Sequence, residues 1–393
     1  MTFFHSLSAA GFAATAISYG PGRMGFGLFV PEFKSAFLMS SSTVGLVSSL
    51  GFVGFFIGLL IAQFFLNRKG PKFPVLTGLT AATIGTSIIA LAPNVAVLAV
   101  GVFLAASSAG FAWTPFNDAV HRKVRDVDRP VALSQISTGT SVGIALAGTL
   151  ALAMGLVEFD WRFCWAVFAG ASALALIGNW AALRQVEKSP EDGPHKGARD
   201  LLHFAAIPLF GIAFAYGITS AVYISFAADH FAQKGLPGFS DGAVSALVFI
   251  FYGLFGLTGL LTDRVRGTIG LTWLLRALLL AAAASLALVP LMSGSWSGLV
   301  FSAGLQGVNV MMTSAVLAFW SERLFPSFPS LGFTASLLAT AAGSVIGSAV
   351  AGMVSDGIGP EAMFYGTAAI PLAAAATLRA RFVVERPVGV SKT

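Results

Sequence analysis

The amino-acid sequence is dominated by apolar stretches that recur along its whole length, separated by short groups of Gly, Pro and charged residues. A helix needs about 20 mostly apolar residues to cross the hydrocarbon core of a bilayer. Only 10% of the 393 residues are charged, against about 25% in an ordinary soluble domain. The sequence therefore predicts an all-α integral membrane protein embedded in the lipid bilayer. We expect twelve transmembrane helices, over residues 8–30, 43–66, 73–91, 95–119, 131–156, 161–183, 201–228, 241–262, 269–291, 298–320, 330–355 and 360–382.

The positive charges fall mainly in alternate connections between these stretches. Of the 23 Lys and Arg residues, 18 lie in one set of connections and in the C-terminal tail, whereas the other set holds only Lys34, Arg162 and Lys234. Cytoplasmic connections retain positive charge, so we expect a multi-pass protein of the inner (cytoplasmic) membrane with both termini in the cytoplasm. The same scattered distribution argues against nucleic-acid binding, because the basic residues form no continuous face.

The longest polar segment follows the sixth stretch and divides the chain into two related halves. We expect an N-terminal six-helix bundle at 1–184, a cytoplasmic linker at 185–200, and a C-terminal six-helix bundle with a short tail at 201–393. Internal repetition supports this division. Three glycines of the fifth helix recur 204 residues later in the eleventh: Gly139, Gly143 and Gly148 correspond to Gly343, Gly347 and Gly352.

The turn after the eighth stretch carries a motif of glycine, acid, basic residues and glycine. Its sequence, Gly259-Leu-Leu-Thr-Asp263-Arg264-Val-Arg266-Gly267, resembles the signature of the major facilitator superfamily of secondary transporters. In the equivalent turn of the first half, Ala62 stands where the family has an acid. With its two sets of six helices, the chain resembles this family over essentially its whole length. The segment from Tyr19 to Arg23 is similar to the YbfB/YjiJ-type branch. The resemblance implies alternating access and assigns Asp263 and Arg264 to gating.

Arg23 is the residue most indicative of function, because it falls at mid-membrane depth in the first helix. A charged residue there must face protein or water. A guanidinium at that depth could bind a carboxylate, sulfonate or phosphate. The alternative is a structural arginine paired with carbonyl groups near Pro21 and Gly22. No acid or histidine lies near the middle of any span, so an anionic substrate would supply the missing counter-charge.

Other polar residues fall within the spans that line the central cavity in the resembled fold. Each could hydrogen-bond a substrate oxygen or join two helices. The candidates for substrate binding, beside Arg23, are Tyr19, Tyr216, Tyr223, Tyr252, Gln306 and Asn309.

Charged residues near the helix ends suggest gates. Asp118 precedes Arg122 by four residues, which favours either a local ion pair or a gate contact on the cytoplasmic side. Glu32, Asp229 and Asp241 lie at the outer ends of their helices, where a solvated rim is the default and an outer gate the sharper alternative.

Small residues on the fifth and eleventh helices predict close helix packing. Gly139, Gly143, Gly343 and Gly347 allow the backbones of neighbouring helices to approach closely. Thin contacts of this kind would let the two halves slide during rocking.

The sequence favours a carrier of a small organic anion over two other classes, an exporter and an enzyme. Proton coupling is one option, since a protonated substrate could itself carry the proton. A proton-driven exporter of amphiphilic or drug-like compounds is the alternative within transport, because the chain contains 35 phenylalanines. An enzyme is not expected, because no cluster of His, Asp, Glu or Cys is available for catalysis or for a metal. We expect no cofactor, and a monomer, because a carrier of this kind needs no partner subunit.

Overall fold

The computed structural model describes residues 3–125, 127–186, 201 and 203–385. All regular structure in this described part is helical. The first half comprises α1 (Phe3–Ile17), the π-helical turn η1 (Ser18–Met24), α2 (Gly25–Leu28), α3 (Val30–Phe37), α4 (Ser41–Lys69), α5 (Lys72–Ala90), α6 (Val95–Gly110), α7 (Trp113–Lys123), α8 (Arg129–Leu156) and α9 (Trp161–Ala182). The second half comprises α10 (Ile207–Lys234), α11 (Asp241–Gly256), η5 (Leu257–Leu261), α12 (Thr262–Ile269), α13 (Leu271–Leu291), α14 (Trp296–Leu324), α15 (Pro329–Ile358), α16 (Pro360–Thr377) and η6 (Ala380–Phe382).

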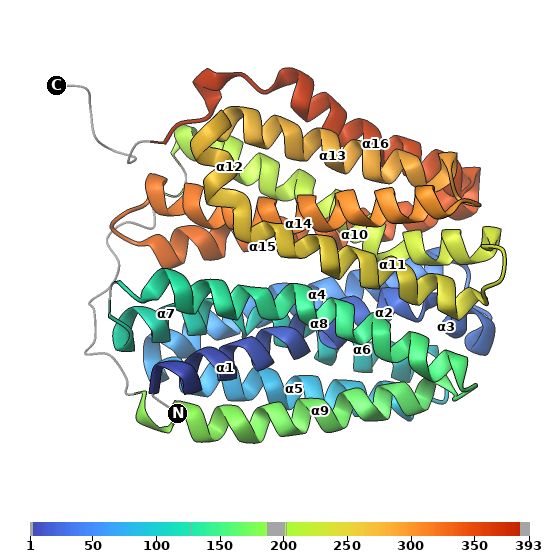
Figure 1. Cartoon of the computed structure of the whole chain (residues 1–393), viewed down its shortest axis with the longest axis horizontal. Coiled ribbons are helices and arrows are strands. Elements are labelled where there is room, and N and C mark those ends of the chain that lie inside the picture. Colours follow the sequence, from blue (N-terminus) through green and yellow to red (C-terminus); the bar gives the residue numbers. More distant parts are fainter. Residues whose placement is uncertain (1–2, 126, 187–200, 202, 386–393) are drawn as a thin grey trace.

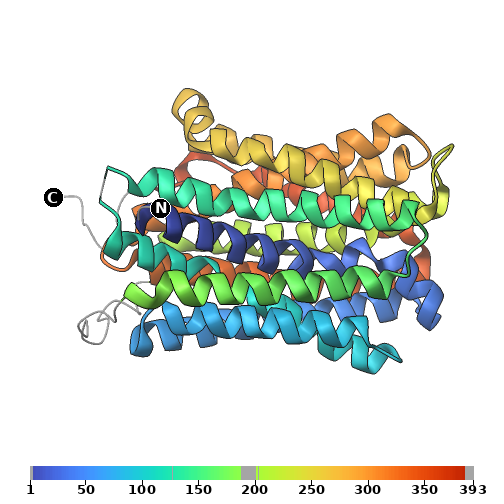
Figure 2. The same ribbon diagram turned by 60° about the horizontal axis from the view of Figure 1, so that its bottom comes forward.

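The long helices run side by side along one axis and form two bundles. Figure 1 shows α1–α9 below and α10–α16 above, and Figure 2 shows the same parallel arrangement from another side. Ten of the described helical segments are long and apolar enough to cross a membrane unbroken. The interrupted first helix and α16 complete the twelve expected spans. Most of the predicted linker, residues 187–200, lies outside the described residues.

The two bundles share two ends. The terminus end carries the start of α1 and η6, at the left of Figure 1, and the opposite end carries α3 and the start of α11, at the right. Large apolar side chains remain exposed on the outer helices, for example Leu174 at 72% and Trp273 at 62%. Exposed apolar surface on helices that satisfy their own backbone hydrogen bonds suits contact with lipid.

The first transmembrane helix is interrupted where the sequence reads Ser-Tyr-Gly-Pro-Gly-Arg-Met. Pro21 lacks the N–H that an α-helix needs, and the backbone widens into the π-helical turn η1 around it. Such widened turns recur at functional sites. Gly20 and Gly22 bring this turn against neighbouring backbone, because a Cβ on Gly20 would collide with Gly143 and one on Gly22 would crowd the Ala105 carbonyl. The turn is therefore held rigidly with Arg23 near its end.

The four glycines predicted to pack helices lie within the halves. Gly139 and Gly143 of α8 meet the backbone of α1, and Gly343 and Gly347 of α15 meet the backbone of α10. The expectation that these four form sliding contacts between halves is wrong. They fix helix pairs inside each bundle.

The contacts between the halves involve the third glycine of each set. Gly148 meets Ala246 of α11, and Gly352 meets Ser41 and Gly45 of α4. At the opposite end of the molecule, the pairs α4 with α15 and α8 with α11 therefore form a close seam. We call this the seam at the opposite end.

Polar groups add to the seam at the opposite end. The Ser48 and Ser225 hydroxyl groups lie 2.5 Å apart, and the Ser49 hydroxyl donates to the Val345 carbonyl at 2.9 Å. The Asp356 carboxylate accepts from the backbone N–H of Ser41 at 3.0 Å and of Ser42 at 2.8 Å. The two halves are joined here by backbone-close packing as well as by side chains.

Candidate functional site

Arg23 lies among aromatic rings at the middle of the molecule. Its guanidinium carbon is 4.5 Å from the centre of the Phe55 ring, 5.7 Å from that of Phe52 and 5.8 Å from that of Tyr19. Its Nε is buried without a hydrogen-bond partner, and within the described residues no carboxylate or carbonyl pairs with it. Cation–π contacts stabilise a guanidinium only partly. The alternative of a structural arginine held by carbonyl groups finds no support in these contacts.

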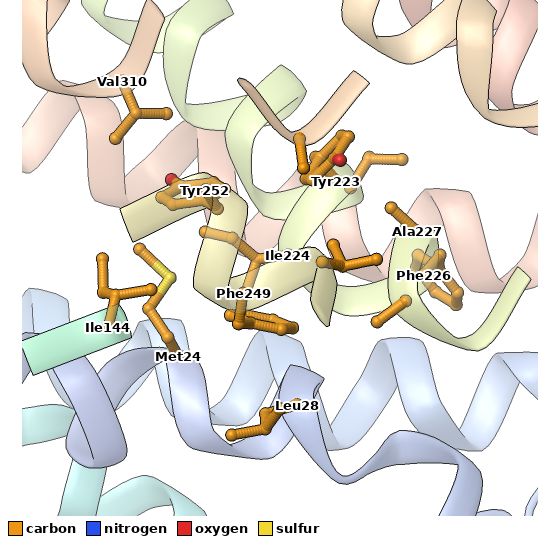
Figure 3. Packing of buried hydrophobic residues seen from close by; sticks show 14 of the residues in the cluster. Met24, Leu28, Ile144, Tyr223, Ile224, Phe226, Ala227, Phe249, Tyr252 and Val310 are labelled. Atoms are coloured by element: carbon orange, nitrogen blue, oxygen red, sulfur yellow. The ribbon is translucent and has the colours of Figure 1, made fainter. Parts of the chain in front are cut away.

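Tyrosines from the other half approach Arg23 across the interface. Arg23 is within electrostatic range of the hydroxyl groups of Tyr216 on α10 and Tyr252 on α11. Figure 3 shows Met24 and Ile144 of the first half facing the part of α11 that carries Tyr252. Arg23 thus contacts the Tyr19 ring, and its charge reaches Tyr216 and Tyr252 in the other half.

The hydroxyl groups of the three buried tyrosines differ in their partners. The Tyr216 hydroxyl donates to the Val310 carbonyl at 3.3 Å, and the Tyr223 hydroxyl accepts from Ser302 at 3.2 Å. The Tyr252 hydroxyl is buried and has no partner in the described part of the chain, although its ring lies 6.2 Å from that of Tyr223. Buried polar groups are normally hydrogen-bonded, so Tyr252 is the tyrosine with capacity left for a ligand.

Gln306 and Asn309 lie on α14 inside the second half. Gln306 is completely buried, and neither its Nε2 nor its Oε1 has a partner among the residues that the structure describes. The Asn309 Oδ1 accepts from Thr313 at 3.2 Å, whereas its Nδ2 is unpartnered in the same set of residues. Asn309 lines a small pocket together with Tyr216 and residues of α13 and α16. All residues that line this pocket belong to the second half.

The predicted gate residues form local ion pairs near the terminus end. Arg122 Nε lies 2.6 Å from the Asp118 carboxylate, within one helix. Asp263 pairs with Arg266 at 2.6 Å and not with its neighbour Arg264. Arg266 also packs over the Phe319 ring. The gating role of Asp263 and Arg264 stays a prediction.

At the opposite end, Asp229 is more buried than the sequence indicated. Lys34 Nζ of α3 bonds the Asp229 carboxylate of α10 at 2.9 Å, which joins the two halves. Asp229 is 8% exposed, so a solvated rim is the wrong description for it, and the next residue, His230, is 4% exposed. Asp241 is exposed, as expected for a rim residue. Asp229 is buried by its contact with Lys34 of the other half, and no local sequence signal reveals such a contact.

Glu32 is the unusual acid of this region. Its Oε2 is buried without a hydrogen-bond partner among the described residues, and its Oε1 lies where a Cβ on Gly242 would come within 2.7 Å. Burial raises the pKa of the Glu32 carboxyl from 4.5 to about 7, opposed by its own backbone N–H and reinforced by the negative charges of Asp229 and Asp241. Glu32 therefore titrates near neutral pH.

No three metal-ligating side chains gather anywhere in the part of the chain that the structure describes. The central arrangement offers instead one unpaired cation, aromatic faces and unpartnered hydroxyl and amide groups. Such a set can bind and release a solute, and within the described residues it lacks a nucleophile poised beside a base.

A family model described as the Major Facilitator Superfamily matches residues 11–292. The chain belongs to this superfamily. It is therefore a multi-pass membrane transporter for a small-molecule substrate and not an enzyme. The YbfB/YjiJ-type branch stays a prediction.

Relatives of this transporter have varied names. It is 28% identical over 318 residues to the transcription regulatory protein OpdE of Pseudomonas aeruginosa, covering 79% of this chain and 76% of that protein. It is 30% identical over 129 residues to a chloramphenicol efflux pump of Mycobacterium tuberculosis, covering 33% of this chain and 31% of the pump.

Solved transporters share the fold. A POT family transporter in complex with 5-aminolevulinic acid superposes with a TM-score of 0.76 at 13% identity, over 95% of this chain and 94% of that one. The nucleoside transporter NupG gives a TM-score of 0.70 at 15% identity, over 97% of this chain and 99% of that one. At such identity the likeness shows the fold alone.

Proposed function

We propose that this transporter carries a small organic anion by alternating access and that Arg23 binds the anionic group. One observation supports this most strongly: Arg23 is half-buried beside three aromatic rings, and it has no counter-charge or hydrogen-bond acceptor among the described residues. An uncompensated charge in such surroundings is costly. A substrate carboxylate or phosphate would remove that cost by a paired, charge-assisted hydrogen bond.

The other candidate binding residues would complete the site from both halves. Tyr19 flanks the guanidinium, and Tyr216 and Tyr252 approach it from the second half. A solute bound between the halves would be released when their contacts rearrange. We propose that residues 1–184 and 201–393 rock against each other, with 185–200 as the linker.

The orientation of the transporter follows from charge. We propose that the terminus end faces the cytoplasm, because 18 of the 23 Lys and Arg residues lie in the connections and tail of that side. The seam at the opposite end then closes the outer side. The ion pairs of Asp118 with Arg122 and of Asp263 with Arg266 lie near the cytoplasmic gate.

Export of amphiphilic compounds is the second candidate function. It is favoured by the aromatic surroundings of the central site and by the similarity of about a third of the chain to a chloramphenicol efflux pump. The two functions differ in what Arg23 does. An anion carrier needs its charge, whereas an exporter of uncharged compounds does not.

A thermal-shift screen of the purified transporter tests the proposal. The ligands are small monocarboxylates, dicarboxylates, sulfonates, phosphates, hydrophobic cations and chloramphenicol, applied to the wild type and to Arg23→Gln. We expect stabilisation by one anion class that disappears in the variant. Arg276→Gln is the matched control, because Arg276 also lies away from the ends of its span and donates to the Leu378 carbonyl at 2.6 Å. Stabilisation by uncharged or cationic compounds alone, equal in wild type and Arg23→Gln, would refute the anion proposal and favour export.

A further inference from the structure

The central site contains a single positive charge. Away from the ends of the expected spans, Arg276 is the only Lys or Arg besides Arg23, and it is engaged by the Leu378 carbonyl and the Trp273 ring. Lys34, at the opposite end, is neutralised by Asp229. Any solute that binds beside Arg23 can therefore have only one of its negative charges compensated by the protein.

The side chains around Arg23 are mainly apolar or aromatic, and the hydroxyl groups of tyrosines are the polar exceptions. Phe52 and Phe55 of α4 are 3% and 0% exposed and present their rings to the guanidinium. Met24, Ile144 and Phe249 are buried where the two halves meet, as Figure 3 shows. A second ionised group on the solute would have to enter these apolar surroundings without a partner, which is strongly unfavourable.

The aromatic side chains beside Arg23 also favour a particular kind of solute body. Aromatic side chains gain from contact with another ring beyond the area that they bury, and the Tyr252 hydroxyl, unpartnered among the described residues, can bond one uncharged polar group. A strongly hydrated solute would exchange most of its water for aromatic carbon at this site, with only a few hydroxyl groups to replace the lost hydrogen bonds. The arrangement favours a flat, mainly apolar body attached to one anionic group.

We propose that the substrate is a monovalent anion with an aromatic or apolar body, and that the single charge of Arg23 excludes dianions. This inference rests on the proposed function, since it assumes that Arg23 binds the anionic group. It narrows that function from organic anions in general to hydrophobic monocarboxylates and their equivalents.

The test compares three probes with a common benzoate core at pH 7.5: benzoate, terephthalate and monomethyl terephthalate. Terephthalate carries two charges, and its monomethyl ester keeps the size while removing one. Glycolate serves as a hydrophilic monoanion.

Affinity is measured by isothermal titration calorimetry on the transporter in detergent, and on its Arg23→Gln and Arg276→Gln variants. We expect the ester to bind at least about 100-fold more tightly than terephthalate, because an unpaired ion in apolar surroundings is strongly disfavoured, and benzoate to bind at least about tenfold more tightly than glycolate.

The possible outcomes separate this inference from the proposed function. Equal affinity for terephthalate and its ester, lost in Arg23→Gln, would leave the anion site standing and overturn the monovalent restriction. Glycolate binding as tightly as benzoate would overturn the apolar body. Absence of Arg23-dependent binding for all four probes would overturn the anion site and this inference with it. Arg276→Gln is expected to leave the ratio of ester to terephthalate unchanged.

Discussion

Glu32→Gln is expected to remove most of the pH dependence of stability near neutral pH. The Glu32 pKa of about 7, against 4.5 in water, corresponds to at most about 3 kcal/mol, at ~1.4 kcal/mol for each tenfold change. Part of the side chain reaches solvent at the opposite end, and we reduce this value to about 1–2 kcal/mol for screening. Glutamine keeps the shape of the side chain and cannot ionise.

The direction follows from proton binding. Between pH 4.5 and about 7 the folded protein holds a proton at Glu32 that the unfolded chain has released. The stability contributed by this group is therefore complete below pH 4.5, declines as the pH rises, and is lost above about pH 7. The glutamine variant should be as stable as wild type at pH 5 and more stable by about 1–2 kcal/mol at pH 8.

Denaturant unfolding in detergent micelles at pH 5, 6, 7 and 8 measures this difference. Glu361→Gln is the matched control, because Glu361 lies at the same end, is 61% exposed, and pairs only loosely with Lys234 at 3.9 Å. It should leave the pH profile unchanged. The reasoning is refuted if wild type and Glu32→Gln show the same dependence on pH, since the buried carboxyl would then titrate as it does in water.

Two further predictions concern the seam at the opposite end and the C-terminal tail. Cysteines at Ser48 and Ser225, whose hydroxyl groups are 2.5 Å apart in different halves, should crosslink on oxidation and stop transport in liposomes until reduced. As a control, a pair of cysteines within the second half, at Ser285 and Ser302, should leave transport active. Equal loss of transport with both cysteine pairs would contradict rocking of the halves. Trp320→Phe removes an indole N–H that donates to the Val384 carbonyl of the tail at 2.7 Å. Loss of this hydrogen bond should destabilise the attachment of the tail by about 1 kcal/mol and speed its proteolysis. Unchanged cleavage would show that the bond does not hold the tail.

The sequence predicted the fold because its signal is long and repeated. Twenty apolar residues in a row have few alternatives to a membrane helix, and the twelve expected spans agree with the described helices to within a few residues at many ends. The sequence predicted only part of the interruption at η1. Pro21 predicted a disturbance, whereas the wider π-helical turn depends on backbone contacts with Gly143 and Ala105.

The candidate site could be predicted only as a set of side chains within the spans. Arg23 stood out because a charge at that depth is rare. Its aromatic neighbours Phe52 and Phe55 were hidden among 35 phenylalanines, and local sequence does not reveal which rings face the guanidinium. Glu32 and Asp229 were misjudged for a related reason. Asp229 is covered by a contact with Lys34 of α3, nearly two hundred residues away in the chain, and Glu32 lies against Gly242 of α11.

The position of the glycines explains how one chain can be rigid within its halves and still open between them. Gly143 and Gly343 have no side chain, so the paired helices inside each bundle pack with their backbones in contact. Gly45 and Gly352 likewise have no side chain at the seam at the opposite end, where the same close approach is made between separate bundles and is supplemented by single hydrogen bonds. At the terminus end the halves meet through side chains, such as the Gln63 amide and the Thr334 hydroxyl at 3.2 Å. Under the proposed rocking, opening at the opposite end would break short-range packing and a few polar contacts without disturbing either bundle, and it would leave the turn that carries Arg23 intact while access to it changes.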